Sequence, residues 1–124
     1  MDDKDKNISF LGWVDDELKK KYLSECKALI FPGIEDFGIV PIEAMASGRP
    51  VIAYKAGGAL DYVVHYKNGF YFNNQTPESL IDAIELFEYE QANLDLKNIR
   101  NSVEKFDKKY FYKNIKNAIS QNFN

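Results

Sequence analysis

The stretch that decides the fold runs Phe31-Pro-Gly-Ile-Glu-Asp-Phe-Gly-Ile-Val-Pro-Ile-Glu-Ala-Met-Ala-Ser-Gly-Arg-Pro-Val-Ile-Ala53. It is typical of the end of a strand, a glycine-bearing loop, a short helix and a second, buried strand. The backbone N–H groups of Gly38, Ile39 and Val40 would then be free at the start of the helix, where an anion binds favourably. The stretch therefore predicts an anion site at a strand–helix junction.

Two carboxylates flank these N–H groups. Glu35 belongs to the loop, and we expect Glu43 in the first turn of a helix that opens around Pro41 and ends at Gly48. A diphosphate carrying hydroxyl-rich groups would suit the pair, with amides for phosphate and carboxylates for hydroxyls. Each residue also has a structural explanation. The helix dipole favours a first-turn carboxylate by about 0.3–1 kcal/mol, and Glu35 can be a solvated loop residue.

The rest of the chain alternates strands with helices. We expect strands at residues 8–11, 28–31, 51–54 and 69–72, the last three buried on both faces. Helices are expected after caps at Asp15 and Thr76 and over residues 59–66. Inward-facing residues of the helix after Thr76 would be Leu80, Ile81, Ile84 and Phe87. Two more helices are expected beyond Tyr89, the first with Leu94, Leu96, Ile99 and Val103 and the second with Phe111, Ile115, Ala118 and Ile119.

This alternation predicts an α/β fold: a Rossmann-like open parallel sheet with flanking helices. With 124 residues, the chain has the size of one domain. We assign residues 1–93 to a partial Rossmann-like domain and residues 94–124 to a helical extension that packs on it.

Composition narrows the function classes. No apolar run approaches the ~18 residues of a membrane span, and the charged first seven residues predict no secretory signal. Cys26 is the single cysteine, which excludes an internal disulfide. A cytoplasmic setting is the simplest expectation.

Charge is unevenly distributed. Residues 1–93 hold 9 basic and 16 acidic residues, whereas residues 94–124 hold 7 basic and 3 acidic ones. The main body is therefore not expected to bind nucleic acid. The basic tail has two interpretations: it covers the sheet and wraps toward another domain, which we favour, or it lies peripherally on an anionic membrane.

Residues 31–53 also resemble the donor-binding signature of the retaining glycosyltransferases of family 4. The family's Glu-x7-Glu pattern runs here from Glu35 to Glu43, with Phe37-Gly38 inside it, and residues 44–48 and 50–53 follow in family order. Further matches are Gly57-Gly58, Asp61 (where the family usually has Glu) and Asn68-Gly69-Phe70. The resemblance covers roughly residues 8–88.

The resemblance implies roles for these residues. Glu43 would accept hydrogen bonds from the ribose hydroxyls of a nucleotide, and Glu35 would contact the transferred sugar at the catalytic centre. The other donor-binding residues would be Phe37, Gly38, Ile39, Val40, Gly57 and Gly58.

The resemblance also implies the context of the chain. It would be part of the C-terminal, donor-binding domain of a two-domain GT-B glycosyltransferase, without the N-terminal acceptor domain and the first strands of its own domain. The donor would be a nucleotide diphosphate sugar, with GDP-mannose our first choice, used in polysaccharide or lipopolysaccharide assembly with retention of configuration. No metal or other cofactor is expected, and the isolated chain is expected to be inactive.

The sequence has two other interpretations. The chain could be a non-catalytic remnant or binding module that needs a separate acceptor domain. A dinucleotide-binding oxidoreductase is disfavoured because no G-x-G-x-x-G follows a strand. Among single residues, His65 is expected near the end of a short helix as a partly exposed surface residue, and Cys26 as a small core or boundary residue. Arg49 is balanced between a phosphate contact and an exposed turn.

Overall fold

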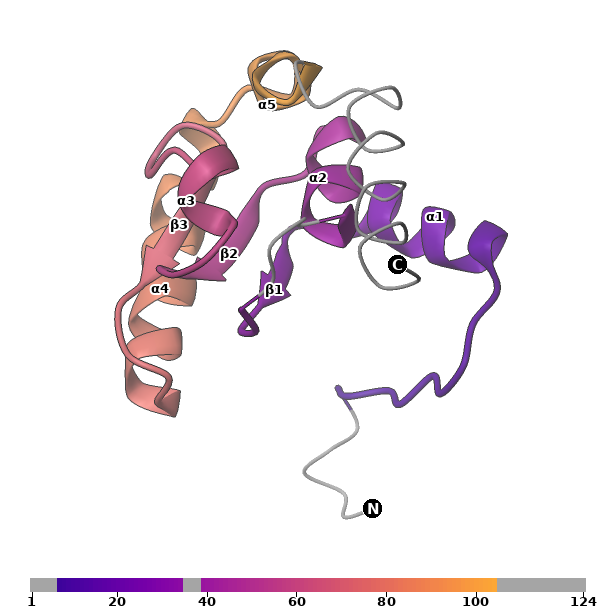
Figure 1. The fold of residues 1–124 in the computed structure, drawn as a ribbon, viewed down its shortest axis with the longest axis horizontal. Helices are drawn as coiled ribbons and strands as arrows, with labels where there is room; N and C mark the ends of the chain where they lie inside the picture. The colour runs from indigo at the N-terminus through magenta and orange to yellow at the C-terminus, as the bar shows by residue number, and fades with distance from the viewer. Residues whose placement is uncertain (1–6, 35–38, 105–124) are drawn as a thin grey trace, which may run out of the picture.

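A computed structural model describes residues 7–34 and 39–104 (Figure 1). Its centre is a parallel sheet of three strands in the order β1-β2-β3: β1 (Leu29–Phe31), β2 (Val51–Tyr54) and β3 (Gly69–Phe72). Ile52 pairs in register with Ile30 on one side and with Phe70 on the other. The three strands expected in these regions and their parallel arrangement are thus confirmed.

Helices connect and flank these strands. They are α1 (Asp16–Glu25), α2 (Ile39–Ala46), α3 (Ala59–Tyr62), α4 (Pro77–Glu90), the 3-10 turn η2 (Gln91–Asn93) and α5 (Leu96–Ser102). Side-chain caps begin three of them. The Asp15 carboxylate accepts from the N–H of Leu18 at 2.8 Å, and the Thr76 hydroxyl accepts from Ser79 at 3.2 Å, as the sequence predicts. Asp95 caps α5.

The sheet is covered on both faces because its central strand is apolar throughout. Val51 and Ala53 of β2 point into a core cluster built with α1, α2, α3 and α5, and Ile52 points into a second cluster with α4. In Figure 1, α4 runs beside β3 and β2, while α2 stands between the sheet and α1. Burial of these side chains is the main stabilising contribution to the fold.

One expected strand is missing. Residues 8–11 lie outside any strand, and their apolar side chains are exposed, with Phe10 80% accessible. A strand forms only where a neighbour accepts its hydrogen bonds, and among the described residues none lies beside this segment. For the same reason β1 is an edge strand, and its Ile30 is 42% exposed, contrary to the expectation of burial on both faces.

Two helices also differ from prediction. Helix α3 ends at Tyr62 rather than near residue 66, because the Asn68 side chain binds the Val64 N–H and the Tyr62 carbonyl. In α4, Leu80, Ile84 and Phe87 pack into the second cluster as expected, and Ala83 joins them. Ile81 is instead exposed, so the inward face is turned away from that residue. The helix predicted around Phe111 lies outside the described residues.

Candidate functional site

The loops that carry the predicted site residues meet at one edge of the sheet. Parallel strands place their carboxyl ends together, so the loop after β1 and the Gly57-Gly58 loop after β2 both emerge there. Helix α2 begins at Ile39 and α3 at Ala59, immediately after these loops. Three predicted site residues, Glu35, Phe37 and Gly38, lie outside the described residues.

A third loop is tied to this edge. The Gln75 side chain, which follows β3, donates a hydrogen bond from Nε2 to the carbonyl oxygen of Pro32, which follows β1, at 3.1 Å. The bond crosses the end of β2. It links the start of the loop that follows β1 to the loop that follows β3.

Glu43 lies deeper in its helix than predicted. Because α2 begins at Ile39, two residues before Pro41, Glu43 is the fifth helical residue, and no acidic residue occupies the first turn. The expectation of a first-turn position was therefore wrong. Proline tolerates the third position because the N–H groups of the first turn have no partner within the helix in any case. The dipole explanation for Glu43 weakens accordingly, since that effect fades beyond the first turn.

The Glu43 side chain is partly exposed, but one of its two carboxylate oxygens is enclosed. Its Oε2 is enclosed and receives no hydrogen bond from the described residues, and the ammonium group of Lys19 on α1 lies 3.4 Å away. The whole side chain is nevertheless 39% exposed, so the accessible surface belongs to its other atoms. One oxygen is thus enclosed beside a cation, while the side chain as a whole is partly exposed.

The glycine pair forms a tight turn into α3. Gly57 has a φ of 60°, which L-residues with side chains rarely adopt, and the Gly58 carbonyl accepts from the Asp61 N–H at 2.9 Å. Gly58 is buried and Gly57 exposed. The backbone at Gly57 can therefore be approached closely by a bound group, with no side chain in the way.

Sequence reasoning did not single out Lys55. It follows β2 directly, and its ammonium group lies 5.8 Å from the centre of the Tyr71 ring. It thus adds a positive charge to the same edge of the sheet. Its position at the end of a buried strand, two residues before a glycine pair, is the signal that could have identified it.

The sequence singled out three further residues, and the structure shows the environment of each one. Arg49 donates from Nε to the carbonyl of Ser24 at 2.8 Å, at the C-terminus of α1, which favours the structural interpretation. His65 is exposed and follows α3 instead of ending it; burial and then Lys55 lower its pKa. Cys26 is half-buried at the end of α1, and burial raises its pKa.

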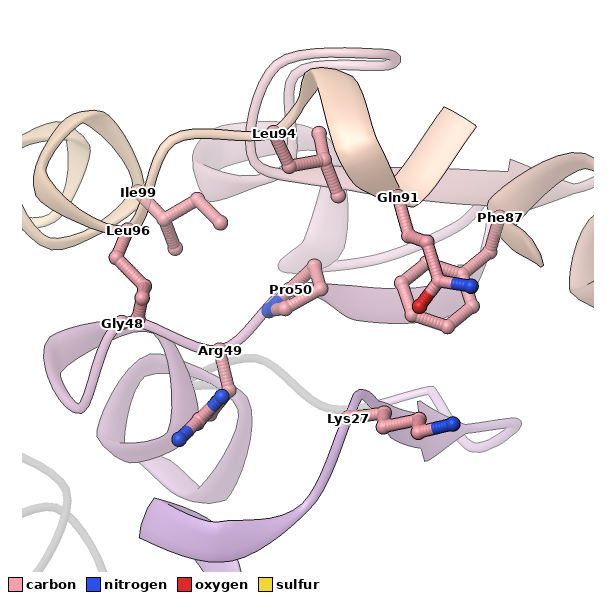
Figure 2. Close-up of a pocket in the computed structure, with 9 residues that line it drawn as sticks. All are labelled: Lys27, Gly48, Arg49, Pro50, Phe87, Gln91, Leu94, Leu96 and Ile99. Carbon is pink, nitrogen blue, oxygen red and sulfur yellow. The ribbon is translucent and has the colours of Figure 1, made fainter. Parts of the chain in front are cut away.

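A pocket lies at the opposite edge of the sheet. Figure 2 shows its lining: Lys27, Gly48, Arg49, Pro50, Phe87, Gln91, Leu94, Leu96 and Ile99. Lys27 and Pro50 precede β1 and β2, so this is the edge of the amino ends. Its volume of about 170 Å³ is below the roughly 300 Å³ of the smallest ligand pockets. The pocket is thus separate from the predicted site.

Residues 7–34 and 39–104 carry neither a metal cluster nor a membrane-spanning helix. No group of three or more His, Cys, Asp or Glu side chains there is arranged to hold a metal ion. No helix in this part of the chain is long and apolar enough to cross a membrane.

Comparisons with known proteins agree on one family. The family model described as glycosyl transferases group 1 matches residues 3–110. The chain is 32% identical over 121 residues to the alpha-1,3/1,6-mannosyltransferase ALG2 of Dictyostelium discoideum, covering 94% of this chain and 29% of that protein. It is 35% identical over 74 residues to an uncharacterized glycosyltransferase of Methanocaldococcus jannaschii, covering 59% of this chain and 19% of that protein.

Solved structures give the same result. A sucrose-phosphate synthase from Thermosynechococcus elongatus superposes with a TM-score of 0.75 at 31% identity, over 93% of this chain and 30% of that one. HepE of Anabaena, in complex with UDP-glucose, superposes with a TM-score of 0.73 at 28% identity, over 91% of this chain and 32% of that one. The chain thus spans less than a third of the length of these relatives. From the family match and the shared fold it follows that this chain belongs to the group 1 glycosyl transferases.

Proposed function

We propose that this chain is the donor-binding part of a retaining glycosyltransferase that uses a nucleotide diphosphate sugar. One observation carries the proposal: the start of α2 and the Gly57-Gly58 loop lie at the carboxyl edge of the same parallel sheet, with Glu43 on α2. Ligands of open α/β sheets bind at such edges. The match to the family over residues 3–110 supports the assignment.

Each part of the edge has a task in this proposal. The N–H groups at the start of α2 and the backbone at Gly57 bind and stabilise the diphosphate, which gains negative charge as the sugar leaves. Glu43 accepts hydrogen bonds from ribose hydroxyls, and Glu35 contacts the sugar. Catalysis then rests on holding the donor and on stabilising the leaving group.

GDP-mannose remains the first choice of donor. The mannosyltransferase relatives favour mannose, whereas HepE has been crystallised with UDP-glucose. A role in polysaccharide or lipopolysaccharide assembly is part of the same proposal. The acceptor would lie on a separate domain, because one wall of a cleft cannot orient a second substrate or exclude water.

A donor panel tests the proposal. Calorimetry of the chain with GDP-mannose, GDP, UDP-glucose, UDP and NAD⁺ should show binding of at least one sugar nucleotide and its nucleoside diphosphate, and none of NAD⁺. Turnover by the chain alone should be undetectable. Binding of NAD⁺ only, or of no nucleotide, would overturn the donor-binding assignment. Sugar transfer by the 124 residues alone would overturn the need for a separate acceptor domain.

A further inference from the structure

Lys19 and Glu43 come from two different helices and meet beside the proposed donor edge. Lys19 is the fourth residue of α1, and its Nζ is 3.4 Å from Glu43 Oε2 and 3.8 Å from the Asp16 carboxylate. Asp16 is almost fully exposed, with 92% of its side chain accessible, so water screens that contact strongly. Glu43 is the less accessible of the two carboxylates, and its Oε2 is enclosed.

An enclosed carboxylate oxygen without a hydrogen bond is unfavourable unless a charge compensates it. Among the described residues, Lys19 is the cation paired with this oxygen. The contact fixes one oxygen of Glu43 toward α1 and leaves the other atoms of the group to form the exposed part of the side chain.

We propose that Lys19 is a positioning residue for Glu43: it anchors Oε2 so that the free side of the carboxylate receives the ribose hydroxyls of the nucleotide. This inference rests on the proposed function, because it needs Glu43 to contact ribose. Lys19 itself does not touch the ligand. Its effect on binding passes through the orientation of the Glu43 carboxylate.

The chain offers a matched control. Lys20 lies next to Lys19 on the same helix and is exposed, so Lys20→Met removes the same charge without removing the contact. Lys19→Arg keeps the charge and, with a longer reach, the pair. Calorimetry with whichever of GDP and UDP binds more tightly would be run on the wild-type chain, Lys19→Met, Lys19→Arg, Lys20→Met, Glu43→Gln and the double variant Lys19→Met/Glu43→Gln.

Lys19→Met should weaken nucleotide binding about 5- to 20-fold, and Lys19→Arg and Lys20→Met less than 2-fold. In the double variant the loss should equal that of Glu43→Gln alone, because the two residues act as one unit. The decisive probe is the 2′,3′-dideoxy form of the same nucleotide. Its affinity should be insensitive to Lys19→Met, since it lacks the hydroxyls that Glu43 binds.

The outcomes separate the two proposals. If Glu43→Gln weakens binding but Lys19→Met behaves like Lys20→Met, the positioning role is wrong and the donor site stands. An equal loss for the ribose and dideoxy nucleotides in Lys19→Met would show a general electrostatic or structural effect and would also overturn the inference. If the wild-type chain binds neither GDP nor UDP, both proposals fail. Circular dichroism melting of each variant identifies any that do not fold, and for a Lys19→Met chain that does not fold, Lys19→Gln replaces it.

Discussion

The Asn68 side chain donates from Nδ2 to the Ser102 hydroxyl at 2.9 Å and thereby joins the loop before β3 to helix α5. Asn68 is 1% exposed. The same Nδ2 donates to the Tyr62 carbonyl, and Oδ1 accepts from the Val64 N–H at 2.7 Å. One buried amide therefore bonds the Tyr62 carbonyl and the Val64 N–H at the early end of α3.

Asn68→Ala should lower the free energy of unfolding by about 2 kcal/mol or more, because each buried donor or acceptor left without a partner costs about 1–3 kcal/mol. Urea denaturation would measure the loss. Asn93→Ala is the matched control: Asn93 is exposed and its amide donates to the Glu90 carboxylate, and we expect a change below about 0.5 kcal/mol. Equal effects of the two substitutions would show that the Asn68 network contributes little.

Gly69 lies against the neighbouring strand, and a Cβ there would collide with the carbonyl oxygen of Val51. Gly69→Ala should therefore destabilise the chain by about 1–3 kcal/mol, the usual cost of overpacking. At Gly33 the described residues that an added Cβ would meet reduce to the Phe31 ring, at 3.9 Å. Gly33→Ala should thus leave the urea midpoint nearly unchanged. A wild-type midpoint for Gly69→Ala would mean that the two strands separate easily.

The two glutamates should differ in what they bind. Glu43→Gln should weaken both GDP and GDP-mannose, because it removes charge from the ribose contact, and Glu35→Gln should weaken chiefly GDP-mannose. Loss of a hydrogen bond to a charged acceptor costs about 1.5–3 kcal/mol. Calorimetry of both ligands with each variant measures the difference, and Glu88→Gln on the exposed side of α4 is the control. Equal losses for both ligands in both variants would contradict this division.

His65 should titrate below its ordinary pKa of about 6.5, since burial and then the Lys55 charge lower its pKa. Its Nδ1 also accepts the Tyr71 N–H at 3.2 Å, which requires the unprotonated nitrogen. The unfolded chain therefore binds this proton more readily, so the stability that His65 contributes is present above about pH 6.5 and is lost as the pH falls through the folded pKa.

A chain with a single histidine makes this measurable by NMR titration. Lys55→Gln should raise the pKa of His65, and Lys97→Gln on α5 should leave it unchanged. A pKa of His65 at or above its ordinary value in the wild-type chain would contradict the assignment.

The N-terminal segment should drive self-association. Trp13 is 90% exposed and stands with Ile8, Phe10 and Leu11 on a stretch without strand pairing. Exposed apolar side chains gathered on one segment favour association with another copy. Sedimentation over a concentration series should show association that Trp13→Ser reduces. Tyr89→Ser, at an 82% exposed position on α4, should not reduce it. A monomer at every concentration would refute this expectation, and strong hydrogen-exchange protection of residues 8–11 would show a paired edge.

The sequence correctly predicted those features that depend on residues close together in the chain. The apolar run of β2, the Asp15 and Thr76 caps and the exit at Gly48 appear where the pattern indicated. Residues 8–11 have an equally good strand pattern and form none, because pairing depends on a neighbour and not on the segment itself. The depth of Glu43 in α2 was missed since proline tolerates several positions in a first turn. Its contact with Lys19 joins residues far apart in the chain, which no local pattern encodes.

The four residues of β2 serve both core clusters, with Val51 and Ala53 on one side and Ile52 on the other. Leu94 also contacts both clusters. Neither cluster can unfold while the other stays intact, because both clusters contain side chains of β2 and would lose them together. The described part of the chain should therefore unfold in one cooperative step, and the slowest-exchanging amides should be those of β2.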